Sequence, residues 1–337
     1  MNKASLAVLL LAVVAHGQGA KAAFRWAVAA SGYNYYSNIV YKRANGQDIK
    51  LDVISIDPPS HPRPTLLYIY GGGWVNGTKG SVTLAPLPYL EQGMNAVVID
   101  YRVADDGLAP AAVEDCRCAF RWVYAHAKQY GFDTSKIVIA GESAGGHLAL
   151  ITAMLPANAG FDNECQQQDE APELKAAAVV SYSGPTDVAD FVEGPHQRWF
   201  ALKWFGSNPN RLELARRISP INYVRPGLPP IIFVHGDSDP HVPYEQAKRL
   251  EDALNRAGVP NKLITLHGPI HGWAVEKELS VEEQVFEALK QYGVLVMSNQ
   301  ARKSSVDGEN HADLGGSVLG CKTCLRSFSF GEANSPP

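Results

Sequence analysis

The chain has 337 residues, of which 46% are hydrophobic and 19% are charged, so it is long and apolar enough to bury a large core. Its formal net charge is −4, and it contains no basic stripe or polybasic flank of the kind that binds phosphates or anionic lipid. This composition predicts a globular protein and argues against a nucleic-acid partner.

The first residues have the pattern of a secretory signal. Lys3 precedes an uninterrupted apolar run over residues 6–15, and small residues follow up to Ala22. A bilayer span needs about 20 apolar residues, so this run is too short for a stable membrane anchor. We expect residues 1–22 to be a signal peptide and the mature protein to be secreted or periplasmic.

The rest of the chain alternates between two hydrophobic patterns. Residues 33–54 alternate apolar and polar positions around Asn45-Gly46, which predicts a hairpin. Later apolar runs are nearly continuous, which is typical of parallel strands that are covered on both faces. The expected strands are 65–70, 95–100, 137–140, 176–181, 231–234 and 262–266, and helical spacing covers 109–130 and 144–153. The prediction is an α/β fold with a mostly parallel central sheet and helices on both faces.

Two inserts and a tail depart from this alternation. Residues 157–173 are polar, whereas residues 185–230 are rich in aromatic side chains and predict a small cap with its own packing. Beyond residue 297 the composition turns to Ser, Asn, Gly and Lys, so we expect a disordered tail over 298–337. The predicted catalytic domain spans 23–297.

The cysteines permit disulfides but do not define their pairing. There are five: Cys116, Cys118, Cys165, Cys321 and Cys324. Export would allow disulfides, and an odd count leaves one thiol over. Cys116 and Cys118 fall on different faces of a predicted helix, and Cys321-x-x-Cys324 lacks a second ligand pair, so we expect no metal site.

The segment Gly141-Glu142-Ser143-Ala144-Gly145 lies between an apolar strand and an Ala/Leu-rich helix. A serine at such a sharp turn adopts a strained backbone conformation that raises its hydroxyl above the strand ends, and the flanking glycines allow neighbouring chain to pass close. Ser143 is therefore the candidate nucleophile.

A serine nucleophile needs a histidine base, and the histidine needs a carboxylate that fixes its tautomer. In enzymes with this strand–serine–helix turn, the acid and then the histidine follow the serine, each on a loop after a strand. The loop after residue 234 offers Asp237 and Asp239, and the loop after residue 266 offers His267 and His271. We favour His271 as the base, because His267 adjoins the strand and is expected to make backbone or packing contacts, whereas His271 lies on the exposed loop.

Acyl transfer also needs hydrogen-bond donors for a developing oxyanion. Tyr70-Gly71-Gly72-Gly73-Trp74 follows an early strand, where glycines would let backbone approach a substrate closely. The predicted donors are the N–H groups of Gly72, Gly73 and Ala144.

Together these segments resemble the serine esterases of the α/β-hydrolase fold, especially the hormone-sensitive-lipase-like and bacterial feruloyl-esterase-like branches. The resemblance spans about residues 38–293 and rests on these pieces: Gly71-Gly72-Gly73-Trp74, Asp100-Tyr101-Arg102, Pro110 to Asp115, Gly141 to His147, Asp239-x-x-Val242-Pro243 and His271-Gly272-Trp273.

The resemblance implies particular roles for these residues. It makes Asp239 rather than Asp237 the acid, His271 the base, and the Gly72 and Gly73 amides oxyanion donors. The family usually has His before the glycines, where this chain has Tyr70, and that change puts the support of the loop in doubt more than the amides. For the matching Asp100, Arg102 and His147 we favour structural roles.

The predicted activity is a two-step acyl transfer in which Ser143 attacks, His271 transfers the proton, Asp239 orients His271 and water releases the acyl group. No metal or organic cofactor is required. The expected protein is a carboxylesterase acting on short-chain or aromatic esters of acetyl or feruloyl type, with a small-molecule or polysaccharide-linked ester as its partner.

Three alternatives remain: a prolyl-oligopeptidase-type peptidase, an arylformamidase, and a hydrolase-fold binding protein without catalysis. The sequence leaves the acyl chain, the alcohol, the oligomeric state and the disulfide pairing open.

Overall fold

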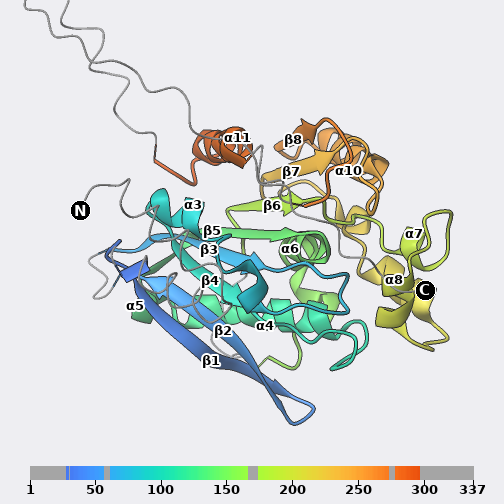
Figure 1. Cartoon of the computed structure of the whole chain (residues 1–337), viewed down its shortest axis with the longest axis horizontal. Helices are drawn as coiled ribbons and strands as arrows, with labels where there is room; N and C mark the ends of the chain where they lie inside the picture. The colour runs from blue at the N-terminus through green and yellow to red at the C-terminus, as the bar shows by residue number, and fades with distance from the viewer. Residues whose placement is uncertain (1–27, 30, 57–60, 166–173, 273–277, 297–337) are drawn as a thin grey trace, which may run out of the picture. The chain divides into compact units, whose positions relative to one another are not determined.

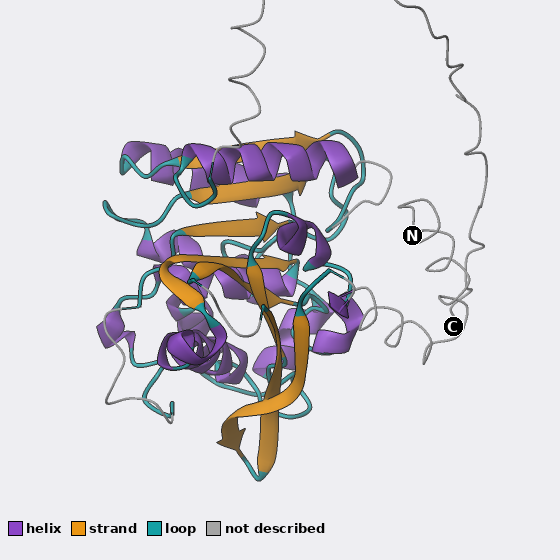
Figure 2. Cartoon of the chain, turned by 90° about the vertical axis from the view of Figure 1, so that its left-hand side faces the viewer, coloured by secondary structure: helices purple, strands orange, loops and turns teal. Residues whose placement is uncertain are grey.

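A computed structural model describes residues 28–29, 31–56, 61–165, 174–272 and 278–296 (Figure 1). The expected signal peptide over 1–22 and the expected tail over 298–337 lie outside the described residues, as do Cys321 and Cys324. Within the described part the chain forms one open sheet of eight strands in the order β1-β2-β4-β3-β5-β6-β7-β8. Helices lie on both faces of this sheet (Figure 2).

The sheet begins with the predicted hairpin. β1 (Asn34–Ala44) pairs antiparallel with β2 (Gln47–Ser55), and Ala44 faces Gln47 across a two-residue turn. Asn45 and Gly46 both have positive φ angles, +53° and +76°, as a tight hairpin turn of type I′ requires. The hairpin prediction is confirmed.

The remaining strands form the parallel part of the sheet. β2 runs antiparallel to β4, and from β4 through β3 to β8 all neighbours are parallel. The interiors of the central strands are buried, so the continuous apolar runs match strands covered on both faces. The bounds are β3 Arg63–Ile69, β4 Asn95–Ile99, β5 Phe132–Glu142, β6 Ala178–Tyr182, β7 Ile231–Gly236 and β8 Asn261–Leu266. The predicted mostly parallel sheet is confirmed.

The helices include one correction to the sequence prediction. The expected helix over 109–130 is two helices, because the backbone at His126 leaves the helical region and separates α4 (Ala111–Ala125) from α5 (Ala127–Tyr130). The others are η1 Lys79–Val82, α3 Leu87–Glu91, α6 Ala144–Met154, η2 Ala157–Ala159, α7 Ala189–Val192, α8 Trp199–Phe205, α9 Arg211–Arg217, η3 Pro220–Tyr223, α10 Tyr244–Arg256 and α11 Glu278–Gln291. The aromatic-rich insert over 185–230 thus contains α7, α8, α9 and η3.

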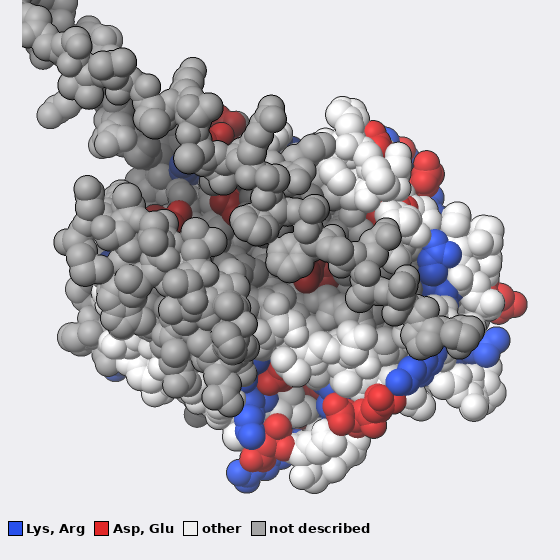
Figure 3. Space-filling model, in the orientation of Figure 1, with Lys and Arg blue, Asp and Glu red and all other residues white. Residues whose placement is uncertain are grey.

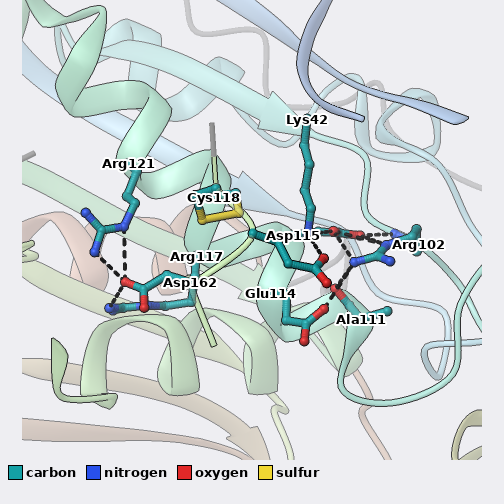
Figure 4. Close-up of a disulfide and its surroundings, with 11 residues drawn as sticks. Lys42, Arg102, Ala111, Glu114, Asp115, Arg117, Cys118, Arg121 and Asp162 are labelled. Carbon is teal, nitrogen blue, oxygen red and sulfur yellow. Dashed lines mark hydrogen bonds and ion pairs between the residues drawn. A yellow bond between two sulfur atoms is a disulfide. The ribbon is translucent and has the colours of Figure 1, made fainter. Parts of the chain in front are cut away.

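A disulfide joins α4 to the first polar insert. Cys118 is bonded to Cys165, while Cys116 is a buried free thiol. Beside this bond, Arg117 and Arg121 both point toward Asp162, with nitrogen–oxygen distances of 3.0 and 2.6 Å (Figure 4). Within the described residues, the structure therefore pairs Cys118 with Cys165.

A second ionic cluster anchors α4 to the sheet. The carboxylate of Asp115 is fully buried and accepts hydrogen bonds from Nε, from Nη2 and from the backbone N–H of Arg102. The Lys42 ammonium lies 3.0 Å from the same carboxylate (Figure 4). A buried carboxylate is tolerated only when it is paired in this way, so Arg102 has the structural role that the sequence favoured.

Acidic and basic side chains are interspersed on the part of the surface that Figure 3 shows uncovered. Among the residues that the structure describes, no helix is long and apolar enough to cross a bilayer.

Candidate active site

Ser143 lies at the sharp turn that the sequence predicts. β5 ends at Glu142 and α6 begins at Ala144, and between them Ser143 has φ +51° and ψ −122°. Its N–H donates to the Tyr182 carbonyl of the neighbouring strand at 2.7 Å, which holds the strained conformation. A Cβ at Gly145 would stand 2.1 Å from the Ile69 carbonyl oxygen, so glycine is required for the helix to pass β3.

The structure brings the three predicted catalytic side chains together. Ser143 Oγ lies 2.9 Å from His271 Nε2, and His271 Nδ1 lies 2.8 Å from Asp239 Oδ2. Because a carboxylate only accepts hydrogen bonds, Nδ1 carries a proton and Nε2 is left free to accept the serine proton. The chain order Ser, Asp, His and the geometry are those of an activated serine.

Asp239 is held in its charged form. Burial acts to raise the pKa of Asp239, but hydrogen bonds from His271, from the Val242 amide and from the His241 amide outweigh burial and set that pKa below its ordinary value. His235 on β7 braces the same loop, since its Nε2 lies 2.9 Å from the Val242 carbonyl. The acid therefore stays ionised across the neutral range.

Asp237 and His267, the two residues that the sequence analysis did not choose, form a separate pair. His267 Nδ1 lies 2.8 Å from Asp237 Oδ2, and the His267 side chain is 87% exposed, whereas that of His271 is 22% exposed. The choice of His271 thus agrees with the geometry, but the reason given for it, that His271 is the more exposed histidine, was wrong. His267 is the exposed histidine, and His271 is largely covered because it lies against Ser143 and Asp239.

The glycine loop lines the same cavity as Ser143. Gly72 has φ +116°, and a Cβ there would meet the Asn76 carbonyl oxygen at 2.1 Å, so only glycine fits. Among the described residues, neither the Gly72 nor the Gly73 amide donates to a backbone carbonyl, and Ala144 as the first residue of α6 has no intrahelical acceptor for its N–H. The assignment of these three amides as oxyanion donors stays a prediction.

Tyr70 supports this loop in place of the usual histidine. Its ring stacks on that of Tyr101 with centroids 4.3 Å apart. The two hydroxyls donate reciprocally, from Tyr70 to the Tyr101 carbonyl at 3.2 Å and from Tyr101 to the Tyr70 carbonyl at 3.1 Å. The loss of support that the departure from the family pattern suggested is thus offset by a tyrosine pair, which single-residue comparison could not reveal.

A cavity of about 380 Å³ opens onto Ser143 and His271. Trp199 and Phe200 of α8 form part of its wall, whereas Trp204 and Phe205 of the same helix are buried, with Trp204 packed against Trp74. The aromatic residues of α8 therefore divide between the cavity wall and the buried core of the molecule.

Two polar residues of the cavity were not assigned a role from the sequence. Glu142 precedes the nucleophile. Burial raises the pKa of its carboxyl group above the ordinary value, and the nearby His271 offsets part of that rise. His241 faces the catalytic histidine, with ring centroids 4.8 Å apart. In the sequence they are marked only by position, because Glu142 lies within Gly141–Gly145 and His241 lies within Asp239-x-x-Val242-Pro243.

Asp100 and His147 have structural contacts. Asp100 accepts a hydrogen bond from the Lys79 amide at 2.7 Å and so fixes the start of η1. His147 is fully buried and is bonded to Trp74 and to the Ile218 carbonyl. Within the described ranges no cluster of three or more His, Cys, Asp or Glu side chains could hold a metal ion.

Relatives of this chain are esterases. Esterase LipC of Mycobacterium tuberculosis is 32% identical over 213 residues, which cover 59% of this chain and 50% of LipC. A probable isoprenylcysteine alpha-carbonyl methylesterase of Arabidopsis thaliana, ICMEL1, is 26% identical over 66% of this chain and 48% of its own length. This chain spans about half the length of the curated relatives it matches.

Solved esterase structures match this chain in fold. Esterase 2 of Thermogutta terrifontis phosphonylated by sarin is 29% identical, with a TM-score of 0.67 over 77% of this chain and 96% of that chain. The same esterase with bound propionate has a TM-score of 0.65 at 29% identity, over 79% and 96% of the two chains. The predicted α/β-hydrolase fold is confirmed.

Two family descriptions match the chain. The one described as TAP-like protein matches residues 213–300. The BD-FAE family matches residues 51–254, which is more than half of the chain. The chain therefore belongs to the BD-FAE family and has the α/β-hydrolase fold of the esterases it resembles.

Proposed function

We propose that the protein is a serine carboxylesterase that hydrolyses short-chain or aromatic carboxylic esters through an acyl-enzyme on Ser143. The observation that carries the proposal is the continuous hydrogen-bonded chain from Ser143 through His271 to Asp239, at 2.9 and 2.8 Å. The family membership and the esterase relatives support the same reaction class.

The proposed reaction has two stages. Ser143 Oγ attacks the carbonyl carbon while His271 Nε2 takes its proton, and the carbonyl oxygen becomes an oxyanion. His271 then gives the proton to the departing alkoxide, which leaves as the alcohol. Water attacks the acyl-serine in the same way, and the carboxylic acid and the free serine are released.

The oxyanion would be held by the amides of Gly72, Gly73 and Ala144. These donors are fixed before substrate binds, so they cost no reorganisation when charge develops. Ala144 is the first residue of α6, so its N–H belongs to the positive end of the helix dipole, which favours a developing negative charge.

The size of the cavity favours small acyl groups. Its volume of about 380 Å³ has Trp199 and Phe200 in its wall, which limits how far an acyl chain can extend. The Thermogutta terrifontis esterase 2 has been solved with propionate and with butyrate. We propose acetyl to hexanoyl esters, or aromatic acyl esters, on a small molecule or a polysaccharide.

A substrate series tests the proposal. We expect nitrophenyl butyrate or hydroxycinnamate methyl esters to be turned over with kcat/KM at least about tenfold above nitrophenyl palmitate. Ser143→Ala should lower kcat by a factor of about 10⁴ or more. Palmitate turnover equal to butyrate turnover, with activation at an oil interface, would favour a lipase instead.

A second candidate is a peptidase. The observation in its favour is the Asp239-x-x-Val242-Pro243 pattern, which peptidases of the prolyl-oligopeptidase type share. Peptide p-nitroanilides and N-formyl anilides in the same assay separate the candidates, because a peptidase or an arylformamidase would cleave its amide substrate efficiently, whereas a carboxylesterase would leave both amides essentially uncleaved. A binding protein without catalysis would turn over no substrate.

We also propose that the mature protein is exported. The apolar run over residues 6–15 suggests it, and the Cys118–Cys165 disulfide supports an oxidising compartment. Mass spectrometry of the protein recovered from culture medium or periplasm should show cleavage close to residue 22. Protein found only in the cytosolic fraction, with its N-terminus intact, would contradict export.

A further inference from the structure

Trp74, the residue that follows the glycine loop, has an unusual backbone conformation. Its φ angle is +61°, which is strained for a bulky side chain, and its side chain is fully buried. The peptide that joins Gly73 to Trp74 ends the loop that presents the proposed oxyanion donors. A strained residue keeps such a conformation only when surrounding contacts over-determine it.

Three contacts of Trp74 could supply that constraint. Its carbonyl accepts from the Ala104 N–H at 2.9 Å, and its ring stacks on Trp204 with centroids 4.6 Å apart. The third contact is a hydrogen bond of 3.1 Å from indole Nε1 to Nδ1 of His147, one turn beyond the nucleophile on α6. Only the third contact ties the loop to the nucleophile helix.

The chemistry of these partners fixes the state of His147. An indole N–H can only donate, so Nδ1 of His147 must accept and carries no proton. Nε2 then carries the proton and donates to the Ile218 carbonyl at 2.8 Å. His147 is fully buried, and burial lowers its pKa to about 4, which keeps it neutral.

The two bonds of His147 join three parts of the site. Trp74 belongs to the glycine loop, His147 to the nucleophile helix, and Ile218 to the end of α9 in the insert over 185–230. The insert also contacts the loop directly, because Trp204 stacks on Trp74 and a Cβ at Gly73 would stand 3.1 Å from the Phe200 side chain. His147 is therefore bonded both to the glycine loop and to the insert that forms part of the cavity wall.

We infer that His147 is a positioning residue for the oxyanion donors, which acts by holding Trp74 in its left-handed conformation and by locking the insert to the same point. The inference rests on the proposed esterase function and adds to it. A loop displaced by about 1 Å can cost about 100-fold in rate. The loss should fall on kcat, because oxyanion contacts form in the transition state and not with the bound ester.

The test removes the Trp74–His147 bond with little change of shape. Trp74→Phe keeps a ring in the stack and deletes the N–H, and we expect kcat for nitrophenyl butyrate to fall about 10- to 100-fold while KM changes less than about threefold. Trp204→Phe is the matched control, because Trp204 Nε1 is buried and has no hydrogen-bond partner among the described residues. We expect that variant to stay within about twofold of the wild-type kcat.

A pair of His147 variants tests the same bond from the other side. The amide of Asn reaches the position of Nδ1, and that of Gln reaches the position of Nε2. We expect His147→Asn to retain most of the wild-type kcat and His147→Gln to resemble Trp74→Phe. The double variant Trp74→Phe/His147→Gln should lose no more than either single variant, since both remove one interaction.

An inhibitor distinguishes positioning from general loosening. An alkyl trifluoromethyl ketone forms a hemiketal alkoxide on the serine, so its Ki should rise in parallel with the loss of kcat/KM, whereas the Ki of butyrate should not change. If Trp74→Phe and Trp204→Phe have equal kcat in an active enzyme, the inference is overturned while the proposed function stands. If the wild type turns over no ester, the proposed function fails and the inference fails with it.

Discussion

At the scale of single residues, two Asp–His pairs lie on adjacent loops, and only one contacts the serine. Asp239 pairs with His271 beside Ser143, while Asp237 pairs with the exposed His267. We expect Asp239→Asn to lower kcat by about 10² to 10⁴, because the amide no longer fixes the tautomer of His271. Asp237→Asn is the matched control and should change kcat less than about threefold. The opposite ranking in steady-state kinetics would transfer the acid role to Asp237.

His147 gives a second prediction at this scale, on stability. Burial lowers its pKa to about 4, whereas an unfolded histidine titrates near 6.5. The unfolded state therefore binds a proton first as pH falls, so the stabilisation is complete above about pH 6.5 and is lost progressively toward pH 4. The shift corresponds to about 3 kcal/mol. Urea unfolding of the wild type and of His147→Asn between pH 7 and 4 measures it, and equal pH dependence in both proteins would contradict it.

Local chemistry located the candidate residues in the sequence. A serine between glycines at a strand end, and acids and histidines on two later loops, follow from the strand pattern and the chemistry of acyl transfer. The choice of Asp239 over Asp237 needed the family resemblance. Contacts between distant residues did not follow, because they need the register of the sheet. The Tyr70–Tyr101 and Trp74–His147 pairs are examples, with separations of 31 and 73 positions.

At the scale of elements, α8 contributes Trp199 and Phe200 to the wall of the cavity beside Ser143. Phe200 lies in the wall and contacts Trp74, with ring centroids 6.0 Å apart. Phe200→Ala should open space beyond the acyl carbon and raise the octanoate-to-butyrate ratio of kcat/KM at least about fivefold, since each methylene in a pocket contributes about 1 kcal/mol or more. Leu202→Ala, on the same helix but outside the cavity wall, should leave that ratio unchanged. An unchanged ratio in Phe200→Ala would remove α8 from the acyl site.

Elements were predicted well where hydrophobic period and turn chemistry agree. The hairpin has both alternation and Asn45-Gly46, and the central strands have continuous apolar runs between turn residues. The division of the helix at His126 was missed, because helical spacing continues through it and only the backbone changes. In the aromatic-rich insert, composition identified a packed unit but could not decide which ring lines the cavity.

At the scale of the whole molecule, the Cys118–Cys165 disulfide closes a loop of 47 positions. Replacing both cysteines with Ala should lower the free energy of unfolding by about 2–4 kcal/mol, because the unfolded chain regains loop entropy. Ester turnover at 25 °C should not change, since the bond does not contact the cavity. Calorimetry of this variant and of reduced wild type should show the same lower Tm. A Tm equal to that of the oxidised wild type would show that the bond does not stabilise the fold.

The central claim is that turnover proceeds through covalent chemistry on Ser143. The most direct measurement is mass spectrometry of the intact protein and its peptides after reaction with paraoxon, a phosphate ester that traps activated serines. We expect one diethylphosphoryl group per chain, located on Ser143, with ester turnover lost in proportion to labelling and no label on Ser143→Ala. Full turnover in a labelled protein, or a label on another residue that accounts for the lost turnover, would contradict the account.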